Sequence, residues 1–154
     1  MADRAVAYIN GGTLYPNIAG RAFFEAVPHG TIIEVEVYGL PALSRQNGKV
    51  IGLHGFHLRD GPSCEPGSNE LPFPYVGGHS NPGDQPHGNH AGGFPMLYSN
   101  GSMARMRFFT GRFQVDDVLR LNVVIHEGPD DSRTQPAGCS GPMIACGLIR
   151  EYMD

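Results

Sequence analysis

Hydrophobic and polar residues alternate most regularly over residues 31–40, TIIEVEVYGL. Ile33, Val35 and Val37 occupy one set of alternate positions, and two glutamates and a tyrosine lie in the other. Successive side chains of a strand point to opposite faces, so this period of two predicts a strand with one buried face. We expect the face of Ile33, Val35 and Val37 to point into a core.

Other short segments have strand character, and turn signals such as Asn-Gly-Gly and Pro-His-Gly separate them. The predicted strands cover residues 4–9, 18–26, 31–40, 50–58, 103–111, 117–127 and 144–149. No segment has the 3.6-residue period of a long amphipathic helix. Short strands between turns predict an all-β fold, either a β-sandwich or a Greek-key barrel. The length fits one domain over residues 1–154.

Two segments lack this alternation. The longer covers residues 60–102 and is rich in glycine and proline, and the shorter covers residues 128–138. Irregular segments this long are unusual inside a compact domain and usually carry function. Because the longer one has few apolar residues, we expect a disulfide and metal ligands to order it. Residues 42–49 are expected to form a polar connection.

Five of the seven histidines lie either in the longer loop or near the end of a predicted strand. They are His57, His79, His87, His90 and His126. Taken alone, each one is interpreted as a surface histidine in a turn-rich segment. Neutral imidazole is the commonest protein metal ligand, and imidazoles from two strands and a loop can close around one or two ions. As a set, these histidines predict a metal site.

Charge and hydropathy exclude several classes of partner. The net charge is −4, Lys49 is the only lysine, and lysine and arginine form no cluster in the sequence, so nothing attracts nucleic acid or an anionic membrane. No apolar run reaches the length of a membrane span. The first residues lack the apolar region of a signal peptide, so the chain is expected to be cytoplasmic, or exported if a leader has been removed.

Five segments follow one another along the chain: GLHGFHL, GGHSNP, PHGNHAGG, VVIHE and GCSGPMIACGLI. In this order they resemble the copper/zinc superoxide dismutases, and the short PHGNHAG form is similar to that of some bacterial members. The resemblance covers nearly the whole chain, from Ala5 to Ile149. It implies a Greek-key β-sandwich or flattened barrel of about eight antiparallel strands with two long functional loops.

The three cysteines are an odd number, which argues against a fully paired secreted framework. The resemblance implies a disulfide between Cys64 and Cys146. Cys139 matches no cysteine of the family, and we interpret it as a small residue in a turn.

The resemblance also implies a role for each histidine of the set. His79 matches the histidine that bridges copper and zinc. His87 and His90 match two further zinc ligands, and His57 and His126 match copper ligands. The implied cofactors are therefore zinc and copper.

Three other residues complete the implied site or lie close to it in sequence. Asp130 matches an aspartate that links the ligands of the two metals and so orients them; as a bare sequence feature it is also a common turn residue. His54 matches a structural histidine and is expected to be buried and hydrogen-bonded. His29, in a Pro-His-Gly turn, is expected to be solvated.

The chain departs from the family pattern at three positions. Arg59 replaces a copper histidine, and a permanent cation without a lone pair cannot serve as a ligand. Its side chain either points at the metal or turns to solvent. Gly93 replaces the zinc aspartate, for which Asp84 or water could substitute. Met143 replaces the arginine that attracts the superoxide anion.

Two functions follow from these matches and departures. In the first, the chain is a zinc-type metal-binding protein with an impaired copper site, in which copper-dependent dismutation is weak or lost. In the second, it is an active dismutase whose substrate is superoxide. A homodimer is compatible with both. A nucleophilic enzyme is a distant third, because no nucleophile motif is present.

Overall fold

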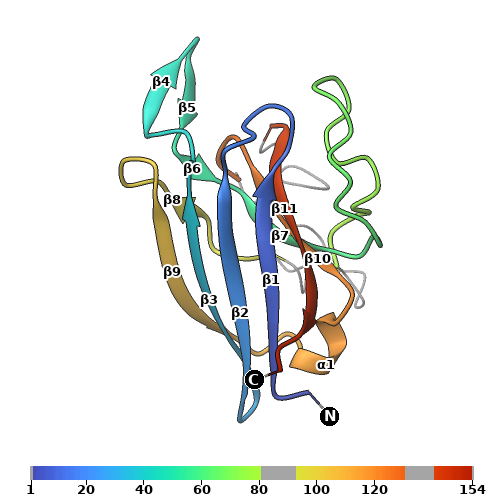
Figure 1. Ribbon diagram of the computed structural model, residues 1–154. Helices are drawn as coiled ribbons and strands as arrows, with labels where there is room; N and C mark the ends of the chain where they lie inside the picture. The colour runs from blue at the N-terminus through green and yellow to red at the C-terminus, as the bar shows by residue number, and fades with distance from the viewer. Residues whose placement is uncertain (1, 81–92, 131–140, 154) are drawn as a thin grey trace.

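The computed structural model describes residues 2–80, 93–130 and 141–153. Its main element is an antiparallel seven-stranded sheet in the order β7-β10-β11-β1-β2-β3-β9. The sheet curls so that β7 and β10 lie behind β1, β2 and β3 (Figure 1). Its strands are β1 (Arg4–Gly11), β2 (Ala19–Val27), β3 (Gly30–Tyr38), β7 (Phe56–Arg59), β9 (Ala104–Thr110), β10 (Asn122–His126) and β11 (Met143–Glu151). The predicted all-β sandwich is confirmed.

Two small strand pairs and one short helix complete the described elements. β4 (Ser44–Gln46) pairs with β5 (Lys49–Ile51) in a hairpin that projects from one end of the sheet (Figure 1). β6 (Leu53–His54) pairs with β8 (Leu97–Tyr98). The helix α1 (Val115–Val118) spans a single turn. In the described part of the chain, no helix is long and apolar enough to cross a membrane.

The alternation in β3 sets the inner face of the sheet as predicted. Ile33, Val35 and Val37 are fully buried. On the outer face, Glu34 and Glu36 lie opposite arginines of β9, with Glu–Arg oxygen–nitrogen distances of 3.5 Å. These exposed pairs contribute little to stability. The buried face therefore fixes the register, because a slip of one residue would bury the glutamates.

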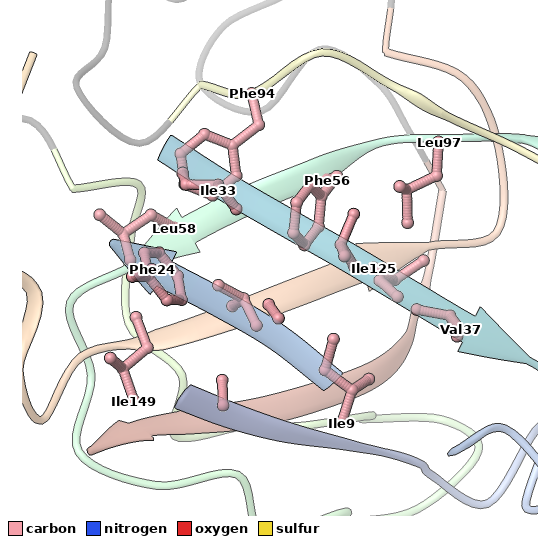
Figure 2. Packing of buried hydrophobic residues seen from close by; sticks show 14 of the residues in the cluster. Ile9, Phe24, Ile33, Val37, Phe56, Leu58, Phe94, Leu97, Ile125 and Ile149 are labelled. Atoms are coloured by element: carbon pink, nitrogen blue, oxygen red, sulfur yellow. The ribbon is translucent and has the colours of Figure 1, made fainter. Parts of the chain in front are cut away.

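The core lies inside the curled sheet (Figure 2). Ile9, Phe24 and Ile33 approach it from one half, and Phe56 and Ile125 approach it from the other. Phe94, which follows the long loop, places its ring centroid 5.0 Å from that of Phe56. The loop that carries the candidate ligands is thus tied to the core at its C-terminal end.

Three local predictions were wrong. The segment 50–58 is divided into β5, β6 and β7, because Gly52 takes a φ of +111° and a Cβ there would lie 2.3 Å from the Cα of Leu43. The polar connection contains the β4–β5 hairpin, and its Asn47-Gly48 turn has positive φ at both residues. Asn-Gly is a strong hairpin signal, so this element could have been recognised.

The third error concerns residues 117–127, of which the first part is not strand. Residues 115–118 form α1, since the Asp117 carboxylate accepts the N–H of Gln114 at 2.9 Å and caps the turn. Val115 and Val118, three residues apart, are both buried. Only residues 122–126 pair as β10.

The first part of the long loop is fastened to the sheet by three kinds of contact. The Cys64–Cys146 disulfide joins it to β11 and confirms the implied pairing. Buried Phe73 and Val76 pack with Val124 and Cys146 in a second apolar cluster. Apolar packing therefore helps to order this segment, contrary to the expectation that its apolar content was too low.

Asn122 supplies the third contact. Its fully buried side-chain amide donates to the carbonyls of Gly61 at 2.9 Å and Val76 at 3.1 Å, the two residues at which the loop closes on itself. Buried carbonyls that lose their donors keep their desolvation cost. Asn122 thus couples β10 to both ends of residues 61–76, the segment that contains Cys64.

Replacing Asn122 with alanine is expected to lower the free energy of unfolding by about 2 kcal/mol, since two buried carbonyls lose a donor. Urea denaturation measures this loss. Asn69→Ala, at an exposed position in the same loop, is the matched control and is expected to change stability by less than about 0.5 kcal/mol. Equal stability of the two variants would contradict the role assigned to Asn122.

Candidate metal centre

Three of the candidate histidines converge on the outer side of β7 and β10. His57 lies opposite Val124 in the β7–β10 ladder, and His126 follows at a β-bulge near the end of β10. The His57 ring centroid is 4.0 Å from that of His79 and 5.0 Å from that of His126. All three side chains are buried, His57 completely. Residues distant in sequence thus form one imidazole cluster.

Hydrogen bonds assign the tautomer of two of these rings. His126 Nδ1 lies 2.8 Å from the carbonyl oxygen of Gly141, so Nδ1 donates and the lone pair is on Nε2. His57 Nε2 lies 2.7 Å from the Asp130 carboxylate, so Nε2 donates and the lone pair is on Nδ1. Such partners orient ligating imidazoles. Both rings are therefore held in a defined tautomer and orientation.

Burial also sets the protonation of His126. Its pKa is lowered to about 3, chiefly by desolvation and also by the nearby His57 and Arg59, although the Gly141 carbonyl and Asp130 act to raise it. The ring is neutral at physiological pH. Its Nε2 lone pair is thus an acceptor for either a metal ion or an N–H donor.

Arg59 takes that lone pair. One terminal nitrogen of its guanidinium donates to the carbonyl of Gly77 at 2.9 Å, and the other lies 3.3 Å from His126 Nε2. Of the two orientations considered for Arg59, the structure has the one directed into the site. Burial lowers the pKa of Arg59, while Asp60 raises it. The cation is held between a loop carbonyl and a histidine.

The described residues do not fit a copper ion in this arrangement. His126 Nε2 cannot accept a guanidinium N–H and bind a metal with the same lone pair. A guanidinium has only N–H donors and no lone pair to offer a metal, so Arg59 cannot take the place of an imidazole ligand. Although three imidazoles lie close together, no group of three or more His, Cys, Asp or Glu among the described residues is arranged to hold a metal.

Comparisons with known proteins place this chain in a family. The family model for copper/zinc superoxide dismutase (SODC) matches residues 18–149. The chain belongs to the copper/zinc superoxide dismutase family. The chain keeps the family fold but carries Arg59 beside His57 and His126.

Individual relatives agree with that assignment. A copper-zinc superoxide dismutase of Deinococcus radiodurans is 35% identical over 150 residues, covering 86% of this chain and 78% of the relative. One from Actinobacillus pleuropneumoniae is 34% identical over 136 residues, covering 79% and 72%. The solved structure of Cu/Zn superoxide dismutase from Brucella abortus has a TM-score of 0.77 and 23% identity, and covers 94% of this chain and 98% of that one. At that identity, the structural match supports the fold alone.

Met143 begins β11 directly opposite His126. Its partly buried side chain packs against the apolar cluster of Phe73, Val76, Val124 and Cys146. Met143, the residue expected to replace the family arginine, therefore lies beside the histidine cluster. A thioether there supplies no charge for an anion.

The other predicted site residues have different outcomes. The backbone of Gly93 pairs with that of His57. His87, His90, Asp84 and Cys139 lie outside the described residues, so the zinc-binding roles expected of the two histidines and Asp84 stay predictions. His29 is exposed, as expected.

His54 is a structural residue, as predicted. It is fully buried, with Nδ1 2.9 Å from the carbonyl oxygen of His126 and Nε2 2.7 Å from Ser99 Oγ. Burial lowers its pKa, so the neutral ring is favoured. It holds the backbone of His126 through that residue's carbonyl oxygen.

Sequence reasoning did not identify the carbonyls of Gly77 and Gly141 as site groups. Gly77 O holds Arg59, and Gly141 O fixes the His126 tautomer. A backbone carbonyl leaves no side-chain signature. The only sequence signal was that Gly77 and Gly141 lie in segments matching family motifs. In the structure both have positive φ, of 77° and 79°, which glycine adopts readily.

Proposed function

We propose that this family member is a metal-binding protein in which zinc is held at His79, His87 and His90 and copper binds weakly. Copper-dependent dismutation is then weak or lost. One observation carries the proposal, namely the guanidinium of Arg59 on His126 Nε2.

Copper would have to displace that guanidinium before it could use His126. Displacement breaks a charged hydrogen bond to Gly77 O at 2.9 Å as well as the contact with His126. Hydrogen bonds to charged groups contribute roughly 1.5–3 kcal/mol each. Even after displacement, the site lacks the imidazole that a histidine at residue 59 would offer. Affinity for copper is therefore reduced twice, by competition and by a missing ligand.

An active dismutase, converting superoxide to oxygen and hydrogen peroxide, is the second candidate. The relatives' names and the clustering of His57, His79 and His126 favour it. Superoxide is the substrate of the family. Zinc has no accessible redox change, so a zinc-only protein cannot run a cycle that depends on metal oxidation state.

Metal analysis of protein purified without added metal, together with a superoxide assay at matched metal content, distinguishes the two candidates. The proposal predicts zinc near one ion per chain, copper well below that, and dismutation that does not rise in proportion to added copper. Stoichiometric copper with full activity would favour the second candidate.

Replacing both His87 and His90 with alanine is expected to abolish zinc binding at micromolar metal, since two of three imidazole ligands are removed. Ligand imidazoles must be neutral, so zinc affinity of the unmodified chain should also fall as the pH drops below about 6.5. Zinc titration with a competing chelator measures both effects. His29→Ala is the control, at an exposed turn. Unchanged zinc affinity in the double variant would refute this ligand set.

A further inference from the structure

We propose that Met96 is a site of oxidation by hydrogen peroxide, and that its sulfoxide displaces Asp130 and loosens the orientation of His57. The backbone N–H of Asp130 donates to Met96 Sδ, with a nitrogen–sulfur distance of 3.2 Å. The carboxylate of the same residue accepts the His57 Nε2 proton at 2.7 Å. The methionine sulfur thus contacts the same residue whose carboxylate fixes the tautomer of a buried imidazole.

Exposure makes Met96 accessible to a small oxidant. Its side chain is 37% exposed, whereas Met103, Met106 and Met143 are each less exposed. Met153 is 80% exposed and lies in the last residues of β11's C-terminal extension, so it serves as a reference methionine. Susceptibility to oxidation follows exposure, so both residues are expected to react.

The reaction is a two-electron oxygen transfer. The thioether sulfur attacks one peroxide oxygen, the sulfur–oxygen bond forms, and the oxygen–oxygen bond breaks. The departing hydroxide takes the second peroxide proton and leaves as water. Met96 is oxidised to the sulfoxide and hydrogen peroxide is reduced, which converts a flexible apolar side chain into a polar one.

The sulfoxide cannot keep the present contact with Asp130. An oxygen that accepts an N–H needs a nitrogen–oxygen distance of about 2.7–3.2 Å, and the sulfur itself already occupies that distance. If the new oxygen faces the amide, the Met96 side chain and the Asp130 backbone must move apart, because the sulfur now lies where that oxygen would have to be. If it points away, the sulfur has given a lone pair to oxygen and is a poorer acceptor. In both cases the present Met96–Asp130 contact is lost, and we infer that Asp130 is then held less firmly against His57.

This inference concerns the His57–Asp130 pair and does not depend on which metal occupies the site. The test uses the full chain with ¹⁵N-labelled histidine, and its metal content is measured before the titration. Hydrogen peroxide is added stepwise, mass spectrometry quantifies sulfoxide at each methionine, and NMR follows the Nε2 resonance of His57.

The Met153→Leu variant isolates the reaction at Met96. Its His57 resonance is expected to shift in proportion to Met96 sulfoxide and to return when methionine sulfoxide reductase removes the oxygen. The Met96→Leu variant conserves apolar volume and is expected to give no shift while Met153 is fully oxidised.

Three results would overturn the proposal. The first is a His57 resonance that stays unchanged when Met96 is fully oxidised. The second is the same shift in Met96→Leu, which would assign the effect to another residue. The third is a Met96 that resists peroxide under conditions that convert Met153.

Discussion

Replacing Arg59 with histidine is expected to raise copper affinity by on the order of a hundredfold or more. Loss of a group that merely supports a ligand costs about 10–100-fold in metal affinity, and this substitution restores a ligand and removes a competing cation. Residues 57 and 59 share one face of β7, because alternate residues of a strand point the same way. A histidine at 59 would thus point into the cluster of His57 and His126. Competitive copper titration measures the change.

Arg59→Gln is the matched control for that experiment. Glutamine removes the cation but offers no imidazole, so its copper affinity is expected to lie between those of the unmodified chain and Arg59→His. This order separates the effect of charge from the effect of the missing ligand. Equal copper occupancy in all three proteins, loaded under identical conditions, would mean that Arg59 does not control the site.

Dismutase activity is expected to rise with Arg59→His but not to full level, because Met143 leaves the approach to the site without its family charge. Adding Met143→Arg should increase the rate mainly at low ionic strength, where attraction of an anion is least screened. Met143 lies opposite His126 in the β10–β11 ladder, so an arginine there begins close to the site. An ionic-strength series on both variants, at equal copper occupancy, measures this contribution. Identical salt dependence would contradict it.

Breaking the Cys64–Cys146 disulfide is expected to lower the free energy of unfolding by about 4.5 kcal/mol in the chain-entropy model, for a sequence separation of 82 residues. Cross-linking so distant a pair restricts the unfolded chain strongly. The native state loses further packing, since Cys146 belongs to the apolar cluster with Phe73 and Val76. Equilibrium denaturation of Cys64→Ser measures the loss.

Cys139→Ser is the control for the disulfide variant and is expected to change stability by less than about 0.5 kcal/mol. Thiol labelling of the oxidised protein should accordingly modify Cys139 alone. The loop also carries Gly77, whose carbonyl holds Arg59. Reduction is therefore expected to loosen Arg59 as well as the fold. A stability change below about 1 kcal/mol in Cys64→Ser would contradict the disulfide's assigned role.

The elements that the sequence predicted well depend on local pattern or on family motifs. Ile33, Val35 and Val37 are buried because their alternation leaves only one possible inward face. The Cys64–Cys146 pair followed from the resemblance and was confirmed. Burial and hydrogen bonding of His54 followed from the same source.

The elements that were missed depend on contacts between distant parts of the chain. Gly52 interrupts a strand because the backbone at Leu43 approaches it, which no local pattern shows. The orientation of Arg59 depends on Gly77 O, 18 residues further along the chain, and on His126, 67 residues further along. From sequence alone, two orientations of Arg59 were equally acceptable, because an arginine side chain reaches either solvent or a buried acceptor.

A crystal structure of the unmodified protein soaked with copper, with anomalous scattering measured at the copper edge, tests the central claim most directly. The account predicts that the Arg59 guanidinium stays on Gly77 O and His126 Nε2, with no anomalous peak between His57 and His126. A full-occupancy copper peak bound to His126 Nε2, with Arg59 turned out to solvent, would contradict it.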